Sequence, residues 1–181
     1  MKTMTFVLVT LMAALASVGF NCINDSFQVA VNLPIVQEYP INPGPAGAYG
    51  GSAVVKLKDI IDQSYLDHMK NVRSYDIRVS TIGQYSGNVS GSVTIDGNTL
   101  LTYSGAWNQF NTPQSVLGTS GLVSSNPVGV QALLTKLNQF TTNQNVTVAV
   151  TGAGTIAGTT VPAGLVLRIE ILSQVDAEIS S

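Results

Sequence analysis

The only histidine of the chain, His68, marks the segment where acid–base or metal chemistry could begin. Asp59, Asp62 and Asp67 precede it closely. A serine triad would have to use His68, but the chain has no Gly-x-Ser-x-Gly motif to present a nucleophile. A zinc site needs three or four nitrogen or sulfur ligands, which one imidazole and scattered carboxylates do not supply. We therefore expect no catalytic residues and no metal site, and on a helix these carboxylates would simply favour the amino-terminal dipole.

A glycine motif follows a predicted strand near the carboxyl end. Gly152, Gly154 and Ala157 match Gly-x-Gly-x-x-Ala, which dinucleotide-binding proteins place between a strand and a helix. That helix is essential because its amino terminus binds the pyrophosphate. The following residues, 158–162, disfavour a helix through glycine entropy, β-branching and a missing amide donor at Pro162. The motif therefore predicts a glycine-rich hairpin turn and no cofactor.

Three aromatic residues form the best candidate for a ligand platform. Tyr103, Trp107 and Phe110 are interspersed with asparagine and glutamine, and flat rings beside amide groups suit stacking on a sugar or a peptide. Tyrosine and tryptophan at the end of a strand more often fill the core and leave a polar tip in water. We favour the core role for these rings, with the platform as the alternative.

The amino terminus has the layout of a secretory signal peptide. Lys2 gives it a positive charge, and residues 6–16 form an uncharged, mostly apolar stretch. This stretch is shorter than the roughly 20 apolar residues that a membrane-spanning helix needs. We expect residues 1–21 to be a signal peptide, cleaved after Ala16 or before Cys22.

The only cysteine, Cys22, is a candidate for lipidation because it lies where a lipoprotein signal places its acylated residue. Asn21 argues against this, since that position favours glycine or alanine, and an inert thiol is the alternative. A lipid on Cys22 would be the only link to a membrane. A single cysteine allows no intrachain disulfide, so residues 22–181 must fold as one domain around a hydrophobic core.

Charged side chains are scarce. They make up 10% of the chain, against about 25% in a typical soluble domain, and the net charge is −2. No basic patch is present in the sequence, which argues against a nucleic-acid partner. Few charges favour association and leave sheet edges poorly protected, although a preference for threonine and asparagine in exported β proteins would give the same composition.

The hydropathy pattern predicts six to eight short strands and two helices. Alternation of apolar and polar residues indicates strands, and the Asp96-Gly97 pair between two of them indicates a type I′ hairpin turn. Helical spacing indicates two helices. The first covers 59–72, with Asp59 or Asp62 as its cap, and the second covers 127–140, with Ser125 or Asn126 as its cap and Pro127 at the first helical position. We expect prolines from Pro34 onward to interrupt regular structure and residues 43–51 to form a loop. The predicted strands cover 27–33, 52–58, 75–80, the hairpin 92–103, 146–150, 165–171 and 174–179.

This order of elements predicts a mainly β fold, an antiparallel β-sandwich (immunoglobulin-like or related) with two short helices. Together with the signal peptide, it favours an exported, non-catalytic structural or adhesive protein of the cell envelope or the extracellular space. Its partners would be copies of itself or another envelope protein. The alternative is a surface module for a glycan or small ligand, either free or lipid-anchored through Cys22.

Overall fold

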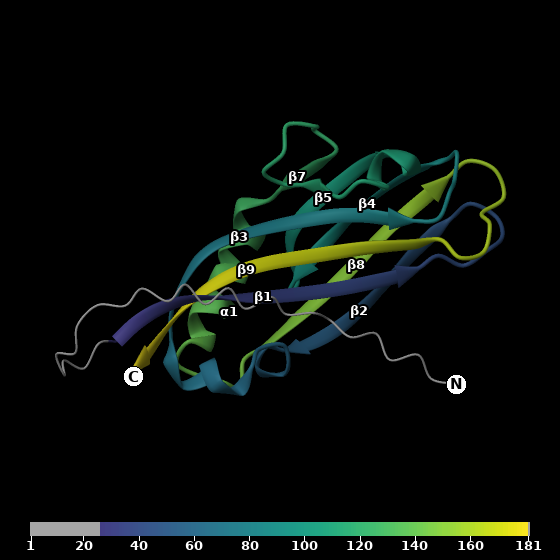
Figure 1. Ribbon diagram of the computed structural model, residues 1–181. Helices are drawn as coiled ribbons and strands as arrows, with labels where there is room; N and C mark the ends of the chain where they lie inside the picture. Colours follow the sequence, from purple (N-terminus) through teal and green to yellow (C-terminus); the bar gives the residue numbers. More distant parts are fainter. Residues whose placement is uncertain (1–25, 181) are drawn as a thin grey trace, which may run out of the picture.

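The computed structural model describes residues 26–180, which fold into two antiparallel sheets and one α-helix (Figure 1). Three short 3-10 segments complete the connections. The elements in chain order are β1 (Ser26–Pro40), β2 (Ala48–Lys56), η1 (Leu57–Asp59), η2 (Gln63–His68), β3 (Met69–Ile82), β4 (Asn88–Ile95), β5 (Asn98–Ala106), η3 (Trp107–Phe110), β6 (Gln114–Ser115), β7 (Val123–Ser125), α1 (Pro127–Phe140), β8 (Thr147–Ala157) and β9 (Val166–Ser180).

The two sheets form a β-sandwich, as predicted. One is four-stranded, in the order β1-β9-β3-β6, and the other is five-stranded, in the order β2-β8-β4-β5-β7. Figure 1 shows the strands of the two sheets crossing obliquely. The last strand, β9, lies between β1 and β3, whereas the last strand of an immunoglobulin domain lies at a sheet edge. The sandwich is therefore of a related kind, without the immunoglobulin strand order.

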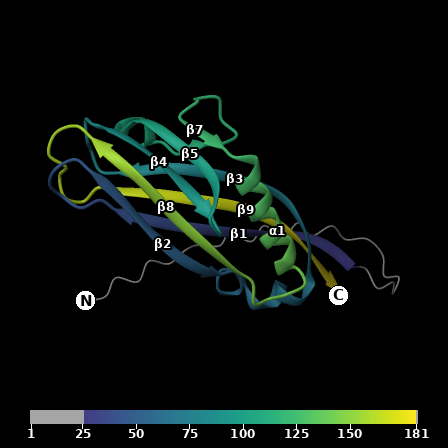
Figure 2. The same cartoon turned by 180° about the vertical axis from the view of Figure 1, so that it is seen from behind.

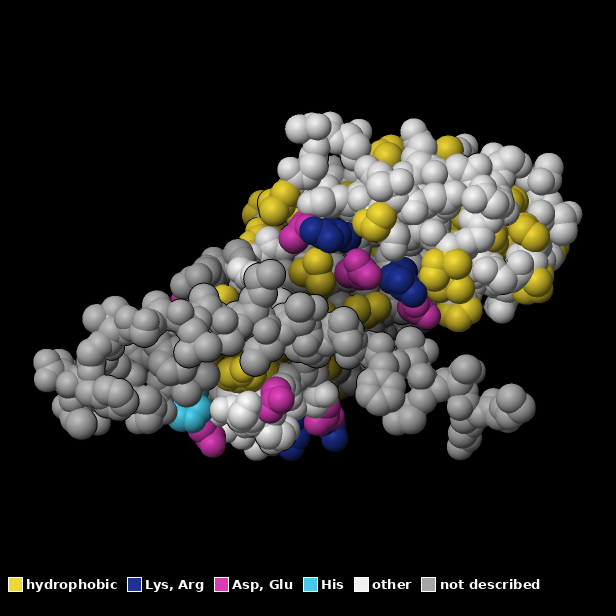
Figure 3. All heavy atoms as spheres, in the orientation of Figure 1, with side chains coloured by type: hydrophobic (Ala, Val, Ile, Leu, Met, Phe, Trp, Pro, Cys, Tyr) yellow, Lys and Arg dark blue, Asp and Glu magenta, His cyan; other side chains and the backbone are white. Residues whose placement is uncertain are grey.

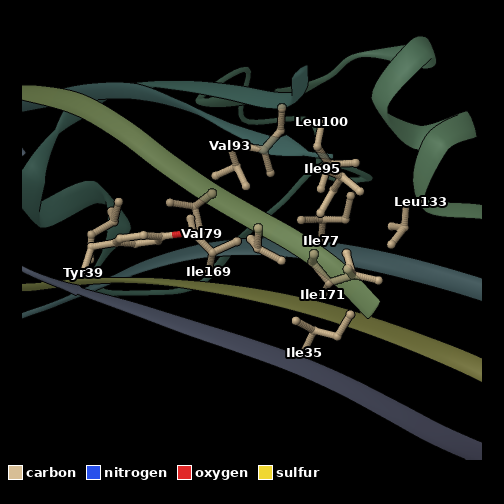
Figure 4. Close-up of a cluster of buried hydrophobic side chains, with 14 of the residues drawn as sticks. Ile35, Tyr39, Ile77, Val79, Val93, Ile95, Leu100, Leu133, Ile169 and Ile171 are labelled. Carbon is tan, nitrogen blue, oxygen red and sulfur yellow. The ribbon is translucent and has the colours of Figure 1, made fainter. Parts of the chain in front are cut away.

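The core lies between the facing sides of the two sheets. Alternate residues of each strand point inward, so Ile77 and Ile171 of the four-stranded sheet meet Val93 and Ile95 of the five-stranded sheet (Figure 4). All four side chains are fully buried. Burial of each such side chain stabilises the fold by about 1.5–3 kcal/mol, so this layer holds the sheets together without a disulfide.

Helix α1 is the one predicted helix that the structure confirms. Asn126 caps it by accepting a hydrogen bond from the Val128 amide at 2.9 Å, and Pro127 occupies the first turn. Leu133, Leu137 and Phe140 are fully buried. In Figures 1 and 2, α1 lies beside β5 and over the part of the four-stranded sheet that extends beyond the five-stranded sheet.

The helix predicted over 59–72 is wrong. That segment forms η1 and η2 and then enters β3, which begins at Met69. Asp62 caps η2 through its bond to the Ser64 amide, and Met69 and Val72 pair with β9. Their helical spacing was coincidental, because pairing with β9 gives the backbone a partner that local propensity does not reveal.

Proline does not interrupt β1, contrary to the prediction. The register of β1 with β9 and the bond from the Ile41 amide to the Leu165 carbonyl at 2.9 Å place the odd-numbered residues in the hydrogen-bonded pairs. Pro34 and Pro40 therefore direct their nitrogen atoms to the free edge, where no amide donor is needed.

Three other boundaries differ from the prediction, and the hairpin agrees with it. Residues 48–51, expected in a loop, form the first half of β2, and the two strands expected over 165–179 are the single strand β9. The glycine-rich segment 152–157 lies inside β8 rather than in a turn. The β4–β5 hairpin is confirmed, since Asp96 and Gly97 have φ values of 47° and 81°.

Candidate interaction surface

The three rings proposed as a ligand platform lie in the core. Tyr103 is 3% exposed, and Trp107 and Phe110 are fully buried. The Trp107 indole donates to the Gly83 carbonyl at 3.0 Å, and the ring packs edge-on against Tyr85 at 6.3 Å between ring centroids. The rings therefore offer no exposed face to a ligand, and they have the core role that the sequence favoured.

The acidic residues around His68 do not converge on a site. Asp62 accepts hydrogen bonds from the amide and hydroxyl of Ser64, which lower the pKa of this carboxyl. Asp67 accepts from the Gln144 amide group at 2.6 Å. Within residues 26–180, no group of three histidine, cysteine or acidic side chains is arranged to hold a metal ion. These residues form local caps and surface contacts.

The glycine motif provides space for tyrosine rings rather than for a nucleotide. A Cβ added to Gly152 would lie 2.6 Å from the Tyr39 ring, which reaches across from β1. A Cβ on Gly154 would lie 2.7 Å from the ring of Tyr49 on β2. Both glycines belong to β8, a strand paired on both sides, with β2 and β4. No helix follows them, so the structure lacks the geometry of a nucleotide-binding turn.

Two tyrosine hydroxyls meet above a row of glycines. Tyr49, Gly154, Gly91 and Tyr103 are neighbours across β2, β8, β4 and β5. The two hydroxyls share a hydrogen bond of 2.5 Å, and Tyr49 also donates to the Ser90 carbonyl at 3.3 Å. Burial raises the pKa of Tyr49 to about 12, and burial together with the adjacent Tyr49 raises the pKa of Tyr103. Both rings are structural and stay neutral over the physiological range.

The outer face of the four-stranded sheet carries ion pairs and a concavity. Arg78 bonds Asp76 at 2.7 Å, and Arg168 bonds Glu38 at 2.5 Å. Figure 3 shows acidic and basic side chains in a line across the visible face, with apolar side chains beside them. The concavity, of about 620 Å³, is lined by Asn32, Leu33, Pro34, Tyr75, Asp76, Arg78, Leu117, Leu172, Ser173 and Gln174.

This concavity has the size of a small-ligand pocket but not the residues that the sequence analysis proposed. None of the three aromatic residues lines it. Its two charged side chains are already engaged, since Asp76 bonds both Arg78 and the Ser115 hydroxyl, the latter at 2.5 Å. A glycan or small-ligand function would have to use this face instead of the Trp107 segment.

The five-stranded sheet differs sharply in its charge. Its strands contain one charged residue, Lys56, which ends β2. Strands of the four-stranded sheet contain nine, namely Glu38, Lys70, Arg73, Asp76, Arg78, Arg168, Glu170, Asp176 and Glu178. The few charged residues of the strands are thus almost all in the four-stranded sheet, and the five-stranded sheet is nearly free of charge.

The outward side chains of this sheet are small and mostly carry a hydroxyl or a methyl group. Strand β8 presents alternating threonine and alanine, and β4 presents serine, threonine and asparagine. Ser90 and Thr155 bond each other across β4 and β8 at 3.2 Å. The exposed or half-exposed residues of this uncharged face are Ala48, Gly50, Ser52, Val54, Asn88, Ser90, Ser92, Thr94, Thr102, Ser104, Thr147, Ala149, Thr151, Ala153, Thr155 and Ala157.

Both sheets end on the same side of the sandwich in a long edge strand, β1 or β2. The opposite edges are β6 and β7, which are only two and three residues long. Strand β1 carries Glu38 and two prolines, the usual protection of an exposed edge. Residues 48–55 of β2 have neither charge nor proline, and Val54 on this edge is 68% exposed.

Sequence reasoning missed this surface, although part of its signal was present. The scarcity of charge and the weak protection of edges were visible in the composition. The sequence did not show which strands share a sheet, so it could not predict that the charges lie mainly in one of the two sheets. The predicted strand began at Ser52, so residues 48–51 of the β2 edge were not recognised as part of a strand.

Comparison with family models, curated proteins and solved structures found no match to this chain. Within residues 26–180, no helix combines the length and the hydropathy needed to cross a membrane. The predicted signal peptide, its cleavage positions and Cys22 lie outside the described residues.

Proposed function

We propose that this chain is an exported, non-catalytic structural or adhesive protein that acts by associating with copies of itself through the five-stranded sheet. The single observation that carries the proposal is the segregation of charge between the sheets. Only Lys56 carries a charge in the strands of the five-stranded sheet, so two such surfaces approach without like-charge repulsion.

The small side chains of this face support close contact. Hydroxyl groups of serine and threonine can hydrogen bond to another protein surface while their methyl and methylene groups pack, and short side chains lose little rotamer entropy when they are covered. Neighbouring Ser90 and Thr155 already bond each other at 3.2 Å, which shows that these hydroxyls can satisfy one another.

A non-catalytic role is proposed because the side chains that could perform acid–base chemistry are not arranged for it. The one histidine of the chain is half-buried at the end of η2, and the nearby Asp62 and Asp67 are engaged with Ser64 and Gln144. No described side chain is paired in the way that general acid–base or nucleophilic catalysis requires. Contact, rather than reaction, is the role that these residues favour.

Export is proposed from residues 1–21. A charged start followed by an uncharged apolar stretch is typical of a secretory signal. Mass spectrometry of the processed chain would test this part, because cleavage after Ala16 and acylation of Cys22 give different masses. An intact Met1 in a chain recovered from the cytoplasm would contradict it.

Sedimentation velocity over a range of concentrations tests the association. The variant Thr155→Lys/Ser104→Lys places two charges on the uncharged face, at exposed positions on either side of Ser90. We expect the unaltered protein to associate and the variant to associate more weakly, because the added charges on one copy repel those on the next. The matched control, Ala30→Lys/Val36→Lys, adds the same charge at exposed positions of β1 and should associate normally. A protein that stays monomeric up to about 1 mM would overturn the proposal.

A further inference from the structure

The hydrogen-bonding groups on the free edge of β2 can be identified from its pairing with β8. The Ile156 amide donates to the Gly47 carbonyl at 2.8 Å, and the Leu57 amide donates to the Val146 carbonyl at 3.2 Å. Both bonds belong to the β2–β8 register, so the odd-numbered residues of β2 bond β8. The even-numbered residues, Ala48 to Lys56, direct their amide and carbonyl groups away from the sheet.

Every residue of the edge strand β2 has a backbone amide donor, whereas β1 lacks two of them. No proline interrupts Ala48–Lys56, whereas Pro34 and Pro40 remove donors from the free edge of β1. The only charge on β2 is at its last residue, Lys56. Natural proteins normally block such an edge with charge, proline or a bulge, because it can pair with another chain.

We propose that the β2 strand of a second copy pairs with this edge in antiparallel orientation, about a two-fold axis at Ser52. This inference rests on the proposed function and specifies the surface of contact. The pairing places Ser52 opposite Ser52, Val54 opposite Gly50, and Lys56 opposite Ala48 of the second copy. Every residue in these pairs belongs to the even-numbered set, so the free amide and carbonyl groups of one copy meet those of the other.

Side-chain size and charge favour a second copy as the occupant. Val54 is 68% exposed, and in this register it lies beside Gly50, which has no side chain to obstruct it. Each Lys56 faces an alanine, so the two like charges lie at opposite ends of the contact. An isologous contact of this kind closes after two copies and joins both five-stranded sheets into one continuous sheet.

The contact is small, which sets its expected strength. One pair of strands buries less surface than a standard protein interface, so we expect a dissociation constant on the order of 10 µM. Dimerisation would therefore depend on the local concentration of the protein at a surface.

Val54→Lys tests the proposed pairing by sedimentation velocity. The substitution replaces the apolar side chain that lies opposite Gly50 of the second copy with a charged one, and the symmetry of the contact makes this change twice. Because Val54 is 68% exposed, we expect the variant to fold normally. We expect the dissociation constant to rise at least about tenfold. Val36→Lys is the matched control, because Val36 is an exposed valine at the free edge of β1 and its replacement should leave the constant unchanged.

A cysteine cross-link provides a second readout that does not depend on affinity. In a Cys22→Ser background, Ser52→Cys should form a disulfide-linked dimer under mild oxidation, because residues opposite each other in antiparallel strands lie within disulfide range. Ser124→Cys, exposed on β7 at the other edge of the same sheet, should remain monomeric.

The outcomes separate this inference from the proposed function. Association that is unchanged by Val54→Lys, with no cross-link at Ser52→Cys, would overturn the β2 pairing while leaving self-association standing. A wild-type protein that does not associate at any concentration would overturn both. Loss of association in Val54→Lys together with the Ser52→Cys cross-link supports the pairing.

Discussion

The two sheets of this sandwich pack against each other but differ in the residues that their strands contain. Nine charged residues and no glycine lie in the strands of the four-stranded sheet, whereas one charged residue and six glycines lie in those of the five-stranded sheet. Glycine weakens an isolated strand through backbone entropy, so its accumulation in one sheet requires a packing reason. That reason is the set of tyrosine rings that lie over the glycines.

The glycines make the five-stranded sheet dependent on close packing. Tyr49 and Tyr103 lie over Gly154 and Gly91, and Tyr39 of the other sheet lies over Gly152. In the four-stranded sheet, by contrast, ion pairs cover the outer face and branched aliphatic side chains fill the inner face. The stability of the five-stranded sheet is thus sensitive to added side-chain volume. The ion pairs of the four-stranded sheet are exposed to water, so changing them should affect stability little.

The largest expected effect is that of Gly91→Ala in β4. The new Cβ would lie 2.5 Å from both the Ala153 carbonyl and the Tyr103 hydroxyl, so the strand or the ring must move. We expect the free energy of unfolding to fall by about 2–4 kcal/mol, as measured by urea denaturation. Ser92→Ala, the next residue and outward-facing, should change it by less than about 0.5 kcal/mol. An equal effect of the two substitutions would remove the claimed asymmetry.

Alkaline pH should act mainly on the five-stranded sheet. Burial raises the pKa of Tyr49 to about 12 in the folded state, above the ordinary tyrosine value of 10.0. The unfolded chain therefore loses the phenol proton first, so the stabilisation is complete below pH 10 and is lost as the pH rises toward 12. Denaturation at a series of pH values should show this decline, and Tyr49→Phe should make it shallower. A flat profile up to pH 12 would contradict the buried tyrosine pair.

The smallest expected effect is that of Glu38→Gln on the four-stranded sheet. Glu38 accepts from Arg168 at 2.9 and 2.5 Å, but both side chains are more than a third exposed. We expect a loss below about 1 kcal/mol that shrinks as salt is added. A double-mutant cycle with Arg168→Gln would measure the pair itself. A coupling as large as the Gly91→Ala effect would mean that the ion pairs hold this sheet together.

Much of the local structure could be predicted from the sequence. The Asp96-Gly97 hairpin and the capped helix α1 follow from residues that act within a few positions of one another. The helix predicted over 59–72 failed because Met69 and Val72 obtain their backbone partners from β9, about a hundred residues away. The core position of Trp107 was also favoured in advance, since a buried indole needs only one acceptor, here the Gly83 carbonyl.

The candidate surface could be predicted only in part. Sparse charge predicted a tendency to associate, but the sequence did not indicate which face or edge would be involved. Pro34 illustrates the difficulty, because a proline that normally ends a strand is tolerated when its nitrogen faces a free edge. Edge positions are known only after the strands have been ordered.

By itself, the sequence determined the mainly β character, the hairpin, the helix α1 and the scarcity of charge, because each depends on composition or on neighbours along the chain. Only the tertiary structure decided that the charges gather on one sheet, that glycines of β8 and β4 face tyrosines of β1, β2 and β5, and that β2 is an unprotected edge. These features depend on which distant strands pair, and that choice is made by the packing of the whole core.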